Sequence, residues 1–521
     1  MLQLNAQRYP LHGRVLPPPY GIGLLLVALL GVPGVAFVLV QLGLAKGIDF
    51  PKFSALAFLF VLAVLGVAIV GRRLSALRTP FYLACLFYVT FVGIGPLLVP
   101  PNFEDPAQAG SNWPIVASWL GMTAMMLGYV SGKVAFRSSK ANLFPGVRDS
   151  LIPLEKLGFV GWGLVALGIT GAALYVERIG GLAALQSAGY YKRPSMLWYD
   201  AALAILMKPG LFLLLGATMA KPRVFVGKRL LLFALTLGAL AWEGPLAGSR
   251  LHVITLVLAL GCLLRLGQGA QRKKAPLFPY RWLVLTGLSF VLVWGALRAY
   301  SITKLREMSF SQLDRAATSQ SSFFVSAFST YDAFVKIVQR VPDSIPYQWG
   351  ETIWESLTVW IPREFWPNKP MGLGDRLTIT LSGEYGVGNT SPTGPGELYL
   401  NFGLLGLLIG MLLVGVGCAW LSQGVSGRPS QDMTASLLLY AVTFPLPLAL
   451  TWGGSDQVVW NLADSTLPIY AVLLVARFLH AFDTAPLATR FRPRTDFDRV
   501  NSRVAWSGGS KPHAREGIAP R

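Results

Sequence analysis

The stretch Glu397–Ser422, ELYLNFGLLGLLIGMLLVGVGCAWLS, holds a single charged side chain, at its first position. A transmembrane helix needs about 20 consecutive apolar residues, so this stretch is long enough to cross a bilayer. Similar runs recur along most of the chain, which is 53% hydrophobic and only 13% charged. The mean hydropathy is +0.52. These features predict an all-α, polytopic integral membrane protein.

Twelve spans are predicted from the apolar runs. Their approximate bounds are 20–45, 53–71, 80–100, 113–136, 157–176, 198–219, 229–249, 250–266, 280–300, 397–422, 433–452 and 456–480. The predicted division of the chain is an N-terminal tail (1–19), a membrane domain of nine spans (20–300), a long extracytoplasmic loop (301–396), three further spans (397–480) and a C-terminal tail (481–521).

The distribution of positive charge predicts the orientation in the membrane. A net charge of +20 would fit a nucleic-acid-binding protein, but Lys and Arg concentrate in short loops and tails on one side. Because cytoplasmic loops carry such an excess, we place both termini in the cytoplasm and expect no nucleic-acid partner. The first apolar run is too long for a signal peptide and is predicted to be a retained span. The basic C-terminal tail is predicted to be disordered, and it either sets orientation or contacts anionic lipid.

The long loop 301–396 is predicted to be partly helical. Apolar residues recur at helical spacings of 3 and 4 at Phe324, Phe328, Tyr331, Val335 and Val338. The opposite face carries the polar residues Ser329, Asp332, Lys336 and Arg340. Such an amphipathic helix is expected either to lie on the membrane surface or to cap the helix bundle.

A second short helix is predicted from Glu351 to about Trp360. Four tryptophans lie close together in this part of the loop, at 349, 354, 360 and 366. They fit an aromatic belt at the level of the lipid headgroups. They equally fit a surface on which sugar rings stack, and the sequence leaves both interpretations open. Further along, MGLGDR (371–376), YGVGNT (385–390) and the Pro–Gly segment 392–396 are expected to form a mobile loop.

Between these elements lies the rigid segment IPREFWPNKP (361–370), which holds three prolines. Proline fixes φ, so the loop loses little entropy on ordering and presents Arg363 and Lys369 in fixed directions. An arginine fork and a lysine point charge suit a phosphate group at the headgroup level. The alternative is that both side chains simply reach the headgroups.

Other cations are predicted at the same outer surface. Arg250 begins the eighth span, Arg298 ends the ninth, and Arg376 follows the rigid segment. Weaker candidates for contact with sugars are Tyr190, Tyr191, Arg193 and Trp366.

Three charged residues fall within predicted spans: Lys208, Glu243 and Asp464. Each costs roughly 2.5–3.5 kcal/mol at mid-bilayer unless it is paired or faces water. They therefore indicate either a cavity open to the outside or a structural salt bridge.

No metal site or bound cofactor is predicted. Cys85, Cys262 and Cys418 are scattered within apolar runs and are interpreted as packing residues. The sequence holds no phosphate-binding G-x-x-x-x-G-K-[ST] motif, no H-E-x-x-H motif and no acidic pair at metal-like spacing.

A sugar transfer outside the cell membrane needs a donor that arrives already activated on a lipid. A polyprenyl pyrophosphate leaves readily once Arg and Lys meet its growing charge, so only the acceptor hydroxyl needs a carboxylate. Glu397, at the outer edge of the tenth span, is the predicted catalytic residue. Glu351, Glu355, Asp375 and Glu384 compete for this role, and a helix N-terminal charge is the structural alternative for Glu397.

Several motifs resemble the bacterial oligosaccharide repeat-unit polymerases, also called O-antigen polymerases. They are YQWGETIWESLTVWIPREFWPNKP (347–370) and GELYLNFGLLG (396–406), with GGLAAL (180–185) and GSR (248–250) further away. The resemblance is strongest over about 345–410 and diffuse elsewhere.

The resemblance implies a metal-independent glycosyltransferase of the bacterial cytoplasmic membrane. Such enzymes join undecaprenyl-pyrophosphate-linked oligosaccharides on the outer side, in the synthesis of surface polysaccharide, O-antigen or exopolysaccharide. Loop arginines of this family are thought to hold the pyrophosphates, which corresponds here to Arg250, Arg298 and Arg363. The implied partners are the lipid-linked donor and acceptor, membrane lipids and a protein that regulates chain length.

Three rival functions remain at this point. A lipid-linked oligosaccharide flippase would suit twelve spans and the intramembrane charges, although no internal repeat is visible in the sequence. A scaffold subunit of an export complex would not need the interfacial cations. The related O-antigen ligases use a histidine in the large outer loop, and this loop contains none.

Overall fold

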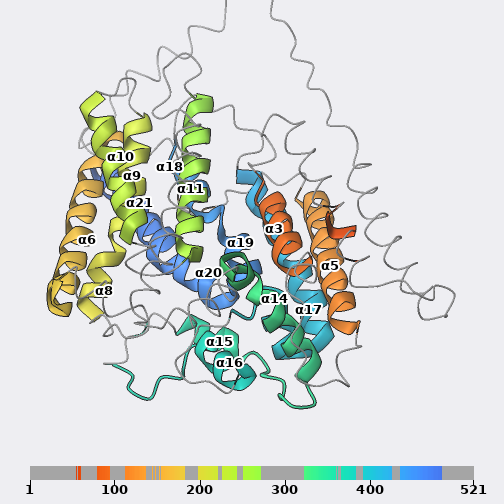
Figure 1. The fold of residues 1–521 in the computed structure, drawn as a ribbon. Helices are drawn as coiled ribbons and strands as arrows, with labels where there is room; N and C mark the ends of the chain where they lie inside the picture. Colours follow the sequence, from red (N-terminus) through yellow and green to blue (C-terminus); the bar gives the residue numbers. More distant parts are fainter. Residues whose placement is uncertain are drawn as a thin grey trace, which may run out of the picture.

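The computed structural model describes residues 79–93, 112–136, 154–181, 198–220, 226–242, 250–270, 322–358, 365–382, 391–424 and 434–483, with a few single positions between them. All regular structure in these residues is helical, which confirms the predicted all-α class (Figure 1). The helices form a bundle, and α14, α15 and α16 from the long loop gather near one end of it.

The bounds of the described elements follow the chain. They are α3 (Pro80–Tyr88), η2 (Val89–Gly93), α5 (Trp113–Ala135), η4 (Leu154–Leu157), α6 (Gly158–Ile179), α8 (Trp198–Ile205), α9 (Met207–Ala220), α10 (Val226–Ala241), α11 (Arg250–Ala270), α14 (Ser322–Arg340), α15 (Glu351–Leu357), α16 (Leu373–Ser382), α17 (Gly394–Leu421), η7 (Ser422–Gly424), α18 (Ala435–Thr443), α19 (Leu446–Gly453), α20 (Ser455–Asn461), η8 (Leu462–Thr466) and α21 (Leu467–Asp483).

Six helical segments in the described residues are long and apolar enough to cross a membrane. They are Trp113–Ala135, Leu154–Ile179, Ala202–Ala220, Gly394–Leu421, Ala435–Gly453 and Ser455–Leu479. The chain is therefore a multi-pass membrane protein.

The expected number of about twelve spans is not reached within the described part of the chain. Predicted spans 20–45 and 280–300 lie outside the described residues, and spans 53–71 and 80–100 lie there in part. The seventh and eighth spans are present as α10 and α11, but their apolar stretches are short: α10 has 16 residues, and the apolar part of α11 is Leu251–Leu264.

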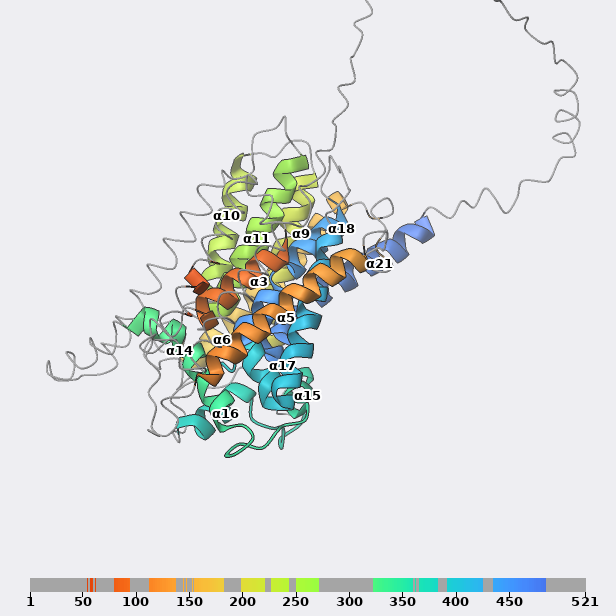
Figure 2. The same ribbon diagram turned by 90° about the vertical axis from the view of Figure 1, so that its right-hand side faces the viewer.

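Glycines allow the spans to pack closely. A Cβ atom at Gly128 of α5 would collide with the Leu412 carbonyl of α17, and one at Gly415 would collide with the Met125 carbonyl of α5. Small residues at such contacts are what helix packing in a membrane requires, because backbones must approach directly. Residue numbers rise together along this contact, so α5 and α17 run parallel, side by side (Figure 2).

A second pair, α6 and α9, packs in the opposite sense. Gly161 of α6 meets Gly210 and Leu214 of α9, whereas Gly168 meets Met207. Residue numbers therefore rise on one helix as they fall on the other, so the two helices are antiparallel. Antiparallel α6 and α9, and parallel α5 and α17, are the directions that the predicted alternation of spans requires.

The amphipathic helix of the long loop is confirmed as α14. Tyr331, Val335 and Val338 are buried, and Asp332 and Lys336 lie on the other side and form an ion pair of 3.1 Å. The helix packs on α5, α17 and η2, so it caps the bundle, which is one of the two predicted placements. The side chains of Phe324, Phe328 and Ser329 are outside the described set.

Two predictions for the rest of the loop were wrong in detail. The second helix, α15, ends at Leu357 rather than near Trp360. The segment 371–376 is not a mobile loop throughout, because α16 begins at Leu373. Likewise Gly394–Gly396 forms the first turn of α17, where Pro395 needs no backbone N–H and the Thr393 hydroxyl accepts from the Gly396 amide at 3.2 Å.

Candidate functional site

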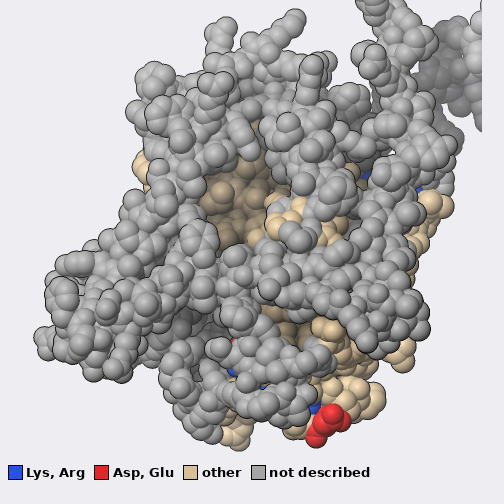
Figure 3. All heavy atoms as spheres, turned by 45° about the vertical axis from the view of Figure 1, so that its right-hand side comes forward, with Lys and Arg blue, Asp and Glu red and all other residues tan. Residues whose placement is uncertain are grey.

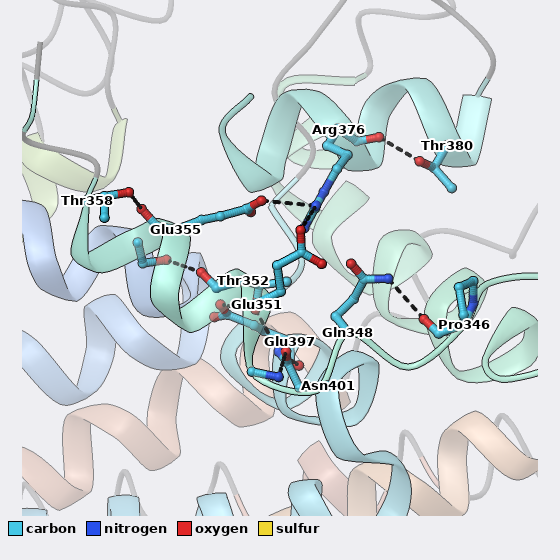
Figure 4. A network of polar contacts seen from close by, with 12 residues as sticks. Pro346, Gln348, Glu351, Thr352, Glu355, Thr358, Arg376, Thr380, Glu397 and Asn401 are labelled. Carbon is cyan, nitrogen blue, oxygen red and sulfur yellow. Dashed lines mark hydrogen bonds and ion pairs between the residues drawn. The ribbon is translucent and has the colours of Figure 1, made fainter. Parts of the chain in front are cut away.

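The candidate site lies where α15 and α16 meet the N-terminal ends of α17 and α20. On the face shown in Figure 3, the visible described atoms are mostly uncharged, and the visible acidic atoms lie toward the lower end of the view. Figure 4 shows the candidate site from close by, with side chains from α15, α16 and α17 pointing toward one another.

Glu397 stands in the first turn of α17, with 2% of its surface exposed. Its Oε1 accepts hydrogen bonds from the hydroxyls of Thr352 (2.9 Å) and Ser455 (2.5 Å), and its Oε2 accepts from the Ser455 amide (2.6 Å). The carboxylate thus joins α15, α17 and α20. Its position at a helix N-terminus is also electrostatically favourable.

Asn401, one turn along α17, completes this buried network. Its amide nitrogen donates to the Thr352 hydroxyl (2.6 Å) and to the Glu397 carbonyl (2.8 Å), and its amide oxygen accepts from the Gly350 N–H (2.7 Å). An amide side chain offers two donors and two acceptor positions, and three of these four are used here. Asn401 therefore fixes the turn that precedes α15 against the membrane-spanning helix.

The helix α17 breaks immediately after Asn401. Phe402 and Gly403 have non-helical backbone angles, with φ of +64° at Gly403. A break within a span frees carbonyl groups that lipid cannot satisfy. Here the N–H groups of Gln348 and Trp349 donate to the Leu400 and Asn401 carbonyls at 3.1 Å each. The loop turn 348–350 thus supplies the hydrogen bonds that the broken span lacks.

The outward side of α15 carries a second charged group. Arg376 of α16 donates from Nη1 to Glu355 Oε1 at 3.0 Å and to Glu351 Oε1 at 3.4 Å (Figure 4). The Glu355 side chain is 7% exposed, the Arg376 side chain 30% and the Glu351 side chain 56%. We call Glu351, Glu355 and Arg376 the rim cluster.

The rim cluster leaves hydrogen-bonding capacity unused. Glu355 Oε2 and Arg376 Nη2 are both buried, and neither has a hydrogen-bond partner among the residues that the structure describes. Burial raises the pKa of Glu355, the Arg376 guanidinium lowers it, and the nearby Glu351 and Glu397 carboxylates raise it again. The net result is a pKa above the usual glutamate value, because the effect of burial outweighs that of the guanidinium.

The predicted phosphate-binding residues are only partly described. Lys369 lies in the rigid segment and donates from Nζ to the Ile361 carbonyl at 2.9 Å. Arg376 is engaged by the two carboxylates of the rim cluster. Arg250 begins α11, but its side chain, like all of Arg298 and Arg363, lies outside the described residues.

Among the predicted sugar contacts, Trp366 is half-buried, and Tyr190, Tyr191 and Arg193 lie outside the described residues. Trp349 and Trp354 are more exposed, at 74% and 64%, and Trp360 lies outside the described residues. Trp349 adopts a φ of +48°, which is unusual for a bulky residue, and its ring contacts Tyr347 and Phe402 edge-on at centroid distances of 5.6 and 6.3 Å. The two interpretations of the tryptophans, headgroup belt and sugar surface, both remain predictions.

The intramembrane charges form a different structure. Lys208 of α9 pairs with Asp464 of η8 at 2.5 Å, and the two side chains are 4% and 6% exposed. The salt-bridge alternative is therefore confirmed for this pair, whereas Glu243 lies outside the described residues. The three cysteines are buried and free, as predicted for packing residues.

Sequence reasoning missed three residues of the network, namely Thr352, Asn401 and Ser455. The local signal for Ser455 was the glycine pair before it, because Gly454 has a φ of +88° and an added Cβ would lie 2.7 Å from Glu397 Oε2. The signal for Asn401 was a single amide in an apolar span. No clusters of metal-ligating side chains occur in the described part of the chain.

Comparison with known proteins identifies one matching family model, a domain of unknown function (DUF8712), over residues 301–426. The matched range contains the long loop and all of α17, and hence the rim cluster, Glu397 and Asn401. It covers less than half of the chain, and its description assigns no activity. No curated protein and no solved structure matches the chain.

Proposed function

We propose that this protein is a membrane glycosyltransferase that polymerises undecaprenyl-pyrophosphate-linked oligosaccharide units on the outer side of the bacterial cytoplasmic membrane. The proposal includes twelve spans, cytoplasmic termini and the loop 301–396 on the outer side. The observation that carries it is the polar end of the bundle, where the buried carboxylates Glu355 and Glu397 and the Arg376 guanidinium gather beside membrane-spanning helices. Charged groups collected in this way at the end of membrane spans are typical of functional sites.

The reaction that these groups suit is a substitution at an anomeric carbon. The acceptor hydroxyl oxygen forms a bond to that carbon, and the bond from the carbon to the diphosphate oxygen breaks with its electron pair on the diphosphate. The hydroxyl proton passes to a carboxylate. The leaving diphosphate needs positive charge rather than a general acid, and we assign that role to Arg250, Arg298, Arg363, Lys369 and Arg376.

The two buried carboxylates differ in their capacity to accept the proton. Both oxygens of Glu397 are already occupied by the three donors from Thr352 and Ser455. Glu355 keeps one oxygen without a described partner, so that oxygen is open to a proton from a hydroxyl group. We keep Glu397 as the predicted base, and Glu355 is the alternative proton acceptor.

The test is an assay of lipid-linked intermediates in cells that carry Arg363→Ala or Glu397→Gln. The glutamine can keep the network, because its oxygen can accept from the Ser455 amide while its NH₂ group donates to the two hydroxyls. We expect both variants to stop polymer growth and to leave single lipid-linked units on the outer leaflet.

Two other results would change the assignment. Units trapped on the inner leaflet in both variants would identify a flippase instead. Polymer of wild-type length in both variants, at wild-type protein levels, would remove the roles given to Arg363 and Glu397.

A further inference from the structure

The ion pair between Glu355 and Arg376 uses only one terminal nitrogen of the guanidinium and one oxygen of the carboxylate. Arg376 Nη1 meets Glu355 Oε1 at 3.0 Å, whereas the second guanidinium nitrogen and the second carboxylate oxygen have no partner among the described residues. A forked arginine–carboxylate pair commonly forms two parallel bonds. A buried donor and a buried acceptor are thus left on the two side chains that this ion pair joins, and each costs free energy until it is satisfied.

The chemistry of a group that fits both atoms is narrow. It must donate to Glu355 Oε2 and accept from Arg376 Nη2, which a hydroxyl group does with one oxygen atom. Local charge argues against an ion: Glu351 and Glu355 surround the guanidinium, and Glu397 is near enough to raise the pKa of Glu355. An anion would be repelled by these carboxylates and a cation by Arg376, so the ligand is neutral and carries hydroxyl groups.

An exposed aromatic side chain adjoins the rim cluster on α15. Residues three and four apart are neighbours on a helix surface, so Glu351 is flanked by Trp354 on one side and by Glu355 on the other. The Trp354 side chain is 64% exposed, whereas Glu355 is 7% exposed. An exposed indole offers a broad apolar surface with a polar edge, which suits the mixed polarity of a sugar ring.

We propose that Trp354, Glu355 and Arg376 form a binding subsite for a neutral pyranose residue. One ring hydroxyl donates to Glu355 Oε2 and accepts from Arg376 Nη2, and an apolar ring face lies on Trp354. The choice of a sugar rests on the proposed function, since that function supplies a neutral polyhydroxyl substrate.

This subsite revises the role of Arg376 in the proposed function. A guanidinium already paired with two carboxylates has little net charge left for a diphosphate. Arg376 therefore orients the sugar, and the diphosphate is left to Arg250, Arg298, Arg363 and Lys369.

The test uses the purified full chain in lipid nanodiscs, applied to a printed array of neutral mono- to hexasaccharides. Wild-type protein is expected to bind at least one glycan. Glu355→Gln keeps a bond to Arg376 Nη1 but presents an amide where the acceptor was, and Arg376→Lys keeps the charge without the second donor arm. Both should lose roughly tenfold or more in binding, as expected for hydrogen bonds to charged groups. Trp354→Ala should also weaken glycan binding.

The matched control is Glu351→Gln, which changes the exposed carboxylate on the same arginine and should bind within about twofold of wild type. The proposal is overturned if wild-type protein binds no glycan, or if Glu355→Gln and Arg376→Lys bind as wild type does. The proposal would also be overturned if Glu351→Gln weakened glycan binding as much as Glu355→Gln does. The loss would then follow from removing any negative charge near Arg376, not from the Glu355 oxygen without a described partner.

The glycan-binding assay and the polymerisation assay distinguish a failure of the sugar subsite from a failure of the proposed function. Binding that depends on Glu355 in a protein that makes no polymer would refute the proposed function and keep the sugar subsite. Polymerisation that is unaffected by Glu355→Gln, with no change in glycan binding, would refute the subsite and keep the proposed function.

Discussion

The Lys208–Asp464 and Glu355–Arg376 ion pairs differ in how completely their hydrogen-bonding atoms are used. Within the bundle, Lys208 meets one Asp464 oxygen, and the Ser465 hydroxyl donates to the other at 2.5 Å. In the rim cluster, Glu355 and Arg376 are joined by one arm, and each keeps an atom without a described partner. Both carboxylate oxygens of the first pair are satisfied within the protein, which is the pattern of a structural contact. The second pair still has one acceptor atom and one donor atom that a ligand could use.

The largest expected effect follows from breaking the pair within the bundle. Lys208→Met leaves Asp464 buried without its counter-charge, which should lower the free energy of unfolding by about 3–5 kcal/mol. Thermal unfolding of the purified protein in detergent measures this. The double variant Lys208→Met/Asp464→Leu removes both charges and should regain most of the loss.

A pair outside the spans provides the control. Lys336 and Asp332 lie four residues apart on α14, with side chains 19% and 26% exposed. Lys336→Met should cost less than about 1 kcal/mol. An equal loss for Lys336→Met and Lys208→Met would contradict a structural role specific to the buried pair.

A smaller effect is expected from cutting the network beneath the rim cluster. Asn401→Leu removes the acceptor of the Gly350 amide and the donor to Thr352, which should cost about 1–3 kcal/mol. Hydrogen exchange at the amides of residues 348–350 should become faster. Gln348→Leu, which removes only an exposed side-chain bond to the Pro346 carbonyl, should leave that exchange nearly unchanged. Unchanged exchange in Asn401→Leu would show that Asn401 does not hold the turn.

The smallest effect concerns pH. Because the pKa of Glu355 is raised in the folded state, the folded protein holds this proton more tightly than the unfolded chain does. The contribution of Glu355 to stability is therefore full below the usual glutamate pKa and is lost as pH rises through the raised value. Melting temperatures measured between pH of about 4 and 7 should fall more steeply for wild type than for Glu355→Gln. Parallel curves would contradict the raised pKa.

A comparison of the predicted helices with the observed ones shows how much of the fold could be predicted from the sequence. Composition and apolar runs predicted the all-α class, the membrane spans that are described and the buried face of α14, because hydrophobic periodicity depends on local sequence. The start of α15 was predicted correctly, but its C-terminal end and the start of α16 were not. These short helices are set by contacts with distant residues, such as the bond between Arg376 and Glu355, more than by local propensity.

The candidate site was predicted only in part. Glu397 and Arg376 were selected because a charge at a span end or beside a rigid loop stands out in the sequence. Glu355 was named as a competitor, but nothing in the sequence showed that Arg376 would satisfy only one of its oxygens. Ser455 and Thr352 were missed because single serines and threonines are common along the chain, and only the fold brings these two to one carboxylate.

The most direct test of the central claim compares the two glutamates of the rim cluster in the assay of lipid-linked intermediates. Glu355→Gln and Glu351→Gln each remove one carboxylate charge that pairs with Arg376. Only Glu355 is buried and keeps an oxygen without a described partner. We predict single lipid-linked units for Glu355→Gln and a wild-type polymer ladder for Glu351→Gln, at equal protein levels. A wild-type ladder from Glu355→Gln would contradict the account.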